Sequence, residues 1–152
     1  MTIDQIRERY LSLFEIDPVA ESDLLEISST LGVHFPADFV EISRFYAGGI
    51  LGGISHHAIS PTGPATNITE ETRRLRAAVS LPHSMVVLAE PPESLIVMQT
   101  RINSDAAVIR CDATDVYRLG NIKDLHNPEL WESYADFFSF LVEREAEDRA
   151  SL

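Results

Sequence analysis

Residues 85–100, MVVLAEPPESLIVMQT, contain two apolar runs, 85–89 and 95–100, on either side of a Pro-Pro pair. Short runs rich in β-branched and apolar residues, separated by turn-forming residues, are typical of neighbouring β-strands. Two more such runs follow, over residues 106–111 and 116–119, with Asn, Asp, Ser and Thr between them. Four short strands joined by tight turns predict an antiparallel meander.

The chain before these strands follows a helical period instead, with apolar residues three and four apart. Gly32 is placed to end one helix, because glycine adopts the left-handed cap conformation at little cost. Asn67 is placed to begin another, and within that helix Glu70 and Arg74 are expected to pair across one turn. The predicted helices cover residues 3–14, 21–31, 36–47 and 67–79.

A final helix is predicted to begin at Asn127-Pro128 and to place Tyr134, Phe137 and Leu141 in the core. Helices come first, antiparallel strands follow, and a helix closes the chain. This order predicts an α+β fold, an antiparallel meander sheet packed by N-terminal, middle and C-terminal helices. A length of 152 residues with 45% hydrophobic residues fits one domain over residues 1–152.

The charge of the chain is its most informative bulk property. Twenty-four acidic and twelve basic residues give a formal net charge of −12. Such a field repels nucleic acid and favours a basic protein partner. No apolar run approaches the roughly 20 residues that cross a bilayer, and the first residues do not resemble a secretory signal. We therefore expect a cytoplasmic protein that binds neither membrane nor nucleic acid.

No catalytic or metal-binding pattern emerges from the sequence. Ser55, His56 and His57 suggest a small hydrolase, but the segment lacks the final glycine of a nucleophile elbow. The five histidines show no zinc spacing, and Cys111 is the only cysteine. Cys111 follows an apolar run and is expected in the core. The sequence therefore predicts no catalytic residue, no metal and no cofactor.

Three segments resemble the SUKH superfamily, the Smi/Knr-like domain. The first is Leu31-Gly32-Val33-His34-Phe35-Pro36-Ala37-Asp38-Phe39, the second is residues 45–49, FYAGG, and the third is residues 134–141, YADFFSFL. The resemblance covers nearly the whole chain in order. Two positions depart from the family pattern: Phe35 stands where leucine is usual, and Ala47 where asparagine is usual.

The resemblance implies a role in protein binding. Bacterial members of the superfamily are immunity proteins that neutralise toxins, often nucleases, and eukaryotic relatives are regulatory interaction domains. A net charge of −12 suits an inhibitor of a basic toxin. A regulatory module without a toxin partner is the alternative. The candidate contact residues, all in the predicted turns and strands near the end of the meander, are Asp105, Asp112, Asp115 and Tyr117.

Overall fold

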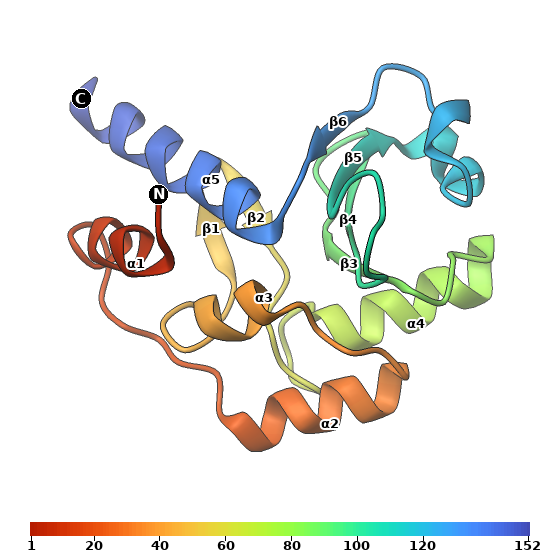
Figure 1. Cartoon of the computed structure of the whole chain (residues 1–152), viewed down its shortest axis with the longest axis horizontal. Helices are drawn as coiled ribbons and strands as arrows, with labels where there is room; N and C mark the ends of the chain where they lie inside the picture. The colour runs from red at the N-terminus through yellow and green to blue at the C-terminus, as the bar shows by residue number, and fades with distance from the viewer.

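The computed structural model describes residues 1–152 and shows helices gathered around a central antiparallel sheet (Figure 1). In chain order the elements are α1 (Ile3–Leu11), α2 (Glu21–Leu31), α3 (Ala37–Ile42), β1 (Gly49–Leu51), β2 (Ile54–His56), α4 (Ile68–Val79), β3 (Met85–Ala89), β4 (Ser94–Gln99), β5 (Val108–Asp112), the 3-10 helices η1 (Ala113–Arg118) and η2 (Ile122–Asp124), β6 (Glu129–Trp131) and α5 (Tyr134–Ala150).

The sheet is a six-stranded meander in the order β1-β2-β3-β4-β5-β6, with every neighbouring pair antiparallel. This arrangement confirms the predicted α+β fold and meander. The strands predicted at 85–89, 95–100 and 106–111 correspond to β3, β4 and β5. The sheet is wider than predicted, because the hairpin β1–β2 precedes those strands and β6 follows them.

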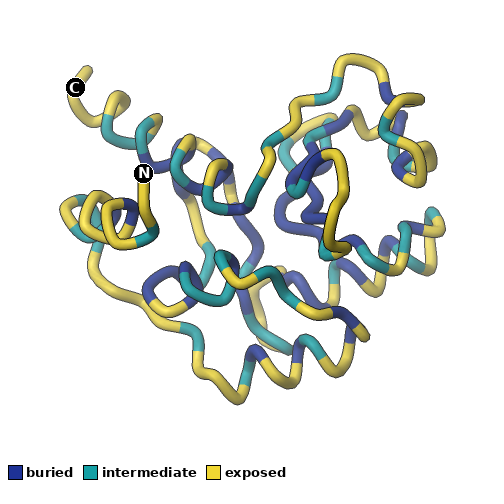
Figure 2. The backbone as a smooth tube through the Cα atoms, viewed as in Figure 1, coloured by how far each residue is buried: buried dark blue, intermediate teal, exposed yellow.

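The central strands are buried on both faces. Val86 and Leu88 of β3 belong to a main core of 25 residues, whereas Met85 and Val87 belong to a second core of 11 residues. Alternate residues of a strand point to opposite faces, so each central strand contributes to both cores. The helices α1, α2, α3 and α5 supply the main core, while η1 and the end of α4 cover the second core (Figures 1 and 2).

The helix signals in the sequence act locally, as expected. Gly32 adopts the left-handed conformation with a φ of 67° and ends α2. The side chain of Asn67 accepts a hydrogen bond from the Glu70 N–H at 2.9 Å and begins α4. Both elements therefore have the predicted bounds within a residue. The helix predicted over 3–14 ends earlier, at Leu11, and α3 covers only residues 37–42, with Pro36 as its N-cap.

Two predictions near the end of the chain are wrong. Residues 116–119 do not form a strand, because η1 turns there and its Asp115 carboxylate accepts the His126 N–H at 2.8 Å. The final helix begins at Tyr134 instead of at Asn127, because residues 129–131 pair with β5 as β6. Ser133 then caps α5 by accepting the Asp136 N–H at 3.0 Å.

The predicted pair of Glu70 and Arg74 is also wrong. Arg74 pairs instead with Glu71, one turn away on α4, and with Glu90, which follows β3. The Glu70 backbone N–H is taken by the helix cap, and its side chain is exposed. Arg74 therefore ties α4 to the end of a strand, a contact between segments distant in sequence that helical spacing does not reveal.

The β1–β2 hairpin packs tightly on α5 through Gly52. A Cβ at Gly52 would lie 2.6 Å from the Leu141 carbonyl oxygen, whereas a Cβ at Gly53 would meet nothing within 4 Å. Both glycines have positive φ, 57° and 77°, so alanine is strained at either position. Alanine substitutions at the two positions therefore separate the cost of backbone strain, which both share, from the cost of close packing, which only Gly52 has.

We expect Gly52→Ala to destabilise the protein by about 1–2 kcal/mol more than Gly53→Ala does. The extra cost arises because the hairpin must move away from the α5 backbone. Urea unfolding of the two variants measures this difference directly. Equal destabilisation would show that the hairpin approaches α5 less closely than described here.

Candidate partner-binding surface

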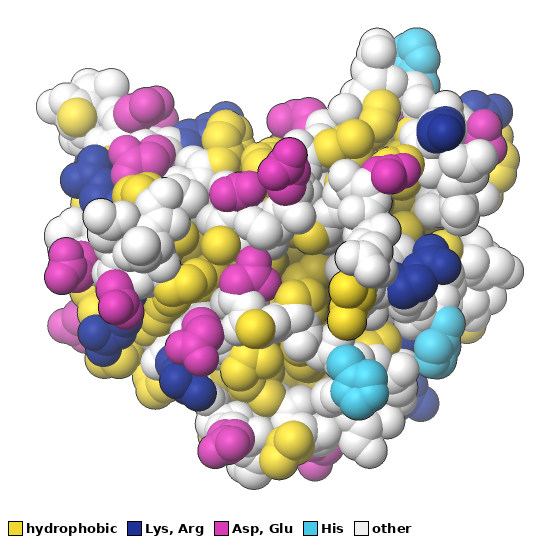
Figure 3. Space-filling model, in the orientation of Figure 1, with side chains coloured by type: hydrophobic (Ala, Val, Ile, Leu, Met, Phe, Trp, Pro, Cys, Tyr) yellow, Lys and Arg dark blue, Asp and Glu magenta, His cyan; other side chains and the backbone are white.

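A cleft of about 440 Å³ opens on the face shown in Figure 3. Its walls come from three parts of the chain: the segment between α2 and α3, the β4–β5 loop, and the junction of β6 with α5. Phe35 and Tyr134 contribute aromatic rings to it, while Asp38 and Glu132 contribute carboxylates. We call this hollow the central cleft.

Asp38 connects two walls of the central cleft. One carboxylate oxygen accepts the Phe39 N–H and the other accepts the Ala135 N–H, each at 2.8 Å. Ala135 lies in the first turn of α5, where backbone N–H groups have no helical partner. The negative charge also complements the positive end of that helix dipole. Asp38, part of the Pro-Ala-Asp-Phe segment, therefore holds the start of α5 against α3.

Replacing Asp38 with asparagine is expected to destabilise the protein by about 1–2 kcal/mol. The amide keeps one acceptor but turns the second oxygen into a donor that opposes a backbone N–H. Asp23→Asn is the matched control, because Asp23 also lies in a helix first turn but makes no side-chain hydrogen bond. Thermal unfolding of both variants tests the difference, and equal values would contradict the bridging role of Asp38.

A buried pair of polar side chains lies behind the central cleft. The Tyr134 hydroxyl is 3.0 Å from His56 Nε2, and His56 Nδ1 is 2.7 Å from the His57 carbonyl oxygen. A carbonyl only accepts, so Nδ1 carries the proton and Nε2 accepts from the tyrosine. Burial lowers the pKa of His56 to about 4, although the hydrogen bond to His57 favours the protonated ring. The histidine is thus a neutral core residue.

The rim of the central cleft is exposed. Ile102, at the tip of the β4–β5 loop, has 87% of its surface accessible to solvent. Glu132 and Arg101 are also exposed at this rim. Asp and Glu side chains lie around the hollow and across the helical half of the same face (Figure 3). An apolar floor with a mixed charged rim is the usual composition of a protein-binding surface.

The four contact residues predicted from sequence do not form one surface. Asp105 lies on the β4–β5 loop, whereas Asp112 lies at the opposite end of β5. Tyr117 is 68% exposed on η1, with the Arg118 guanidinium 5.1 Å from its ring centroid. Asp115 is only 6% exposed and holds the 3-10 segment through His126 and Arg118. Asp115 is therefore a structural residue in the folded chain.

The residues suggested for a hydrolase are not brought together. Ser55 is exposed on β2 and makes no side-chain hydrogen bond to either neighbouring imidazole. His57 instead contacts Thr66 Oγ1 at 2.9 Å and Glu90 Oε2 at 3.0 Å. These contacts fasten the loop between β2 and α4 to the end of β3.

The Thr66–His57–Glu90 chain is a feature that sequence reasoning missed. Burial raises the pKa of Glu90, but the hydrogen bond and charge of Arg74, together with His57, outweigh it and leave that pKa below its usual value. The ion pair between Glu90 and Arg74 therefore holds α4 against the end of β3. Thr66, His57 and Glu90 come from different segments and meet only in the folded protein. Spacing along the sequence therefore gives no signal for these contacts.

Three further observations bear on other classes of site. No group of three or more His, Cys, Asp or Glu side chains is arranged to hold a metal ion. Cys111 is buried in the second core, and burial raises the pKa of its thiol to about 11, with Asp115 and Asp112 adding to the shift. No helix combines the length and apolar character needed to span a bilayer.

The fold is an α+β meander sheet packed by helices, with the central cleft on one face. The family described as SMI1-KNR4 cell-wall, a SUKH family, matches the sequence over residues 1–141. Because this match covers most of the chain, the protein belongs to the SMI1-KNR4 family. Membership confirms the SUKH resemblance and supports an interaction domain of the immunity type. No curated protein matches this sequence.

Proposed function

We propose that the protein is an immunity protein that neutralises a basic toxin by direct binding, and that the toxin is a nuclease. The net charge of −12, in a family of interaction domains, is the observation that supports this proposal most strongly. A nuclease carries basic residues where it binds phosphates, so an acidic inhibitor complements that surface. Opposite charges also speed encounter between the two proteins.

The contact surface in this proposal is the central cleft and its rim. Ile102 supplies an exposed apolar anchor, and Glu132 supplies charge beside it. Asp105 lies on the same loop as Ile102 and adds a second acidic side chain beside this surface, whereas Asp112 and Tyr117 lie away from it. Apolar anchors at the centre and charges at the rim provide affinity and association rate respectively.

Affinity capture from native cell lysate at low and high salt, with the retained proteins identified by mass spectrometry, tests the partner. We expect a basic nuclease that is retained at low salt and weakened at high salt. Co-expression should then relieve the toxicity of that nuclease. A retained toxin whose toxicity persists on co-expression, or retention of no basic protein, would contradict the proposal.

Charge reversal tests the surface separately from the function. Glu132→Arg and Asp105→Arg should each weaken binding of the captured toxin by about fivefold or more at low salt. Glu26→Arg, an exposed acid on α2, is the matched control because it changes net charge equally. If all three variants weaken binding equally, binding depends on the net charge of the protein and not on this surface.

A further inference from the structure

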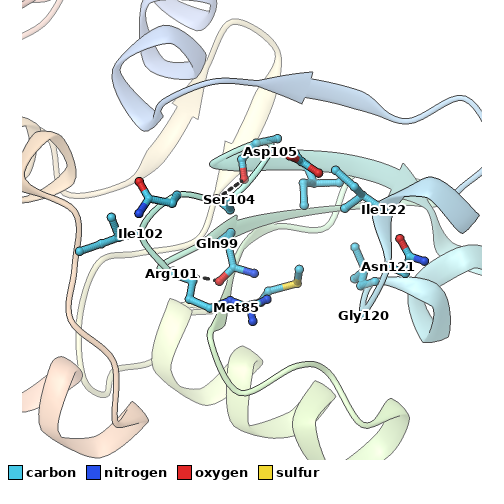
Figure 4. Close-up of a pocket in the computed structure, with 13 residues that line it drawn as sticks. Met85, Gln99, Arg101, Ile102, Ser104, Asp105, Gly120, Asn121 and Ile122 are labelled. Carbon is cyan, nitrogen blue, oxygen red and sulfur yellow. Dashed lines mark hydrogen bonds between the residues drawn. The ribbon is translucent and has the colours of Figure 1, made fainter.

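A second hollow, of about 310 Å³, lies between the β4–β5 loop and the 3-10 helices (Figure 4). It opens on the second-core side of the sheet, and we call it the sheet-end hollow. Its apolar floor comes from Met85, Ile109, Leu119 and Ile122. The volume lies at the small end of the range for sites that take small molecules.

Gln99 breaks the apolar pattern at this hollow. Leu95, Val97 and Gln99 point to the same face of β4, and the first two belong to the second core. Gln99 is only 5% exposed, and its Oε1 accepts the Arg101 N–H at 3.0 Å. Its Nε2 has no hydrogen-bond partner in the chain, and Figure 4 shows this amide turned towards Gly120 and Asn121.

The Gln99 Nε2 atom keeps some contact with solvent through the hollow, so a ligand there can reach this donor. An apolar residue at position 99 would instead extend the second core, as Leu95 and Val97 do. Positions that break the local pattern in this way are expected at functional sites. The free amide therefore points to a ligand that offers an acceptor oxygen.

Two exposed charges of opposite sign line the same hollow. Arg101 and Asp105 lie on either side of Gln99 in Figure 4. Neither forms an ion pair with any other residue of the chain. The hollow thus presents a cation, an anion and a free N–H donor around an apolar floor.

We propose that the sheet-end hollow binds a free α-amino acid with an apolar side chain. The ligand carboxylate pairs with Arg101 and accepts the free N–H of Gln99. The ligand ammonium pairs with Asp105, and the apolar side chain packs on Leu119 and Ile122. A zwitterion satisfies both charges and the donor at once, whereas a singly charged ligand leaves one charge unpaired. The proposal does not require the toxin, although the hollow shares the β4–β5 loop with the surface proposed for that partner.

Titration of ¹⁵N-labelled protein with L-leucine, followed by NMR, tests the site. We expect saturable shifts in the Gln99 side-chain amide and in residues 101–105 and 120–122, with a dissociation constant on the order of 1 mM. Leucinamide, which lacks the carboxylate, and N-acetyl-leucine, which lacks the ammonium, should each bind about fivefold more weakly. Equal binding of all three probes would overturn the zwitterion assignment.

Two exposed substitutions separate the roles of the charges. Arg101→Gln should remove the preference for leucine over leucinamide, and Asp105→Asn should remove the preference for leucine over N-acetyl-leucine. Arg118→Gln and Asp112→Asn are matched controls that lie outside the hollow and should leave both preferences unchanged. The absence of saturable shifts in the wild-type protein up to about 20 mM leucine would overturn the proposal.

Discussion

Phe39→Ala is expected to lower the free energy of unfolding by about 3–5 kcal/mol. The Phe39 side chain is fully buried in the main core, with ring centroids 4.7 Å from Phe35 and 4.8 Å from Tyr134. Its removal leaves a cavity at the point where α3 meets α5, and the surrounding aromatic rings are held by other contacts. Urea unfolding measured by circular dichroism gives the value.

Phe140→Ala is the matched control for this substitution. It makes the same chemical change on α5, but the Phe140 side chain is 43% exposed and packs mainly against Trp131. We expect a loss of about 1 kcal/mol or less there. A loss below about 1 kcal/mol at Phe39 would show that the α3 face has been assigned wrongly.

Acidification is expected to remove about 2.5 kcal/mol of stability between about pH 7.5 and pH 4.5 through His56. The pKa of the buried ring is about 4, below the ordinary value of 6.5. Between these two values the unfolded chain takes up a proton that the folded chain excludes. Falling pH therefore favours unfolding, and the full contribution is present above the unfolded pKa.

Comparison with His56→Gln isolates this contribution. Glutamine offers an amide to the Tyr134 hydroxyl but does not titrate, so the variant should lose about 2.5 kcal/mol less on acidification than the wild type does. Urea unfolding at both pH values gives the two differences. An identical pH dependence in the two proteins would mean that His56 is not the buried neutral group described here.

Much of the fold could be predicted because its signals are local. Gly32, Asn67 and the apolar runs of β3 and β4 act within a few residues of themselves. The segment from 113 to 131 could not be predicted in this way. Its apolar residues alternate over too short a length to separate a strand from a 3-10 turn, and the Asp115 contact that decides it reaches eleven residues ahead.

The candidate sites were harder to predict than the fold. Asp105 was predicted as a partner contact from its place in a turn, and it stays a prediction; the structure places it on the exposed β4–β5 loop. The central cleft was not predicted, because its walls come from residues 34–38, 99–107 and 132–134. One signal was present in the sequence: Gln99 ends an apolar run at a position where the pattern calls for another apolar residue.

The burial of β3 and β4 on both faces has a consequence for folding kinetics. In a sheet with one solvent-exposed face, shifting the strand register by one residue exposes the apolar side chains to water and is strongly unfavourable. Here the same shift only exchanges side chains between the main core and the second core. Misaligned hairpins are therefore expected to keep most of their apolar burial and to rearrange slowly. The strand register must therefore be set by the turns at residues 90–93 and 100–107 and not by a contrast between apolar and polar faces.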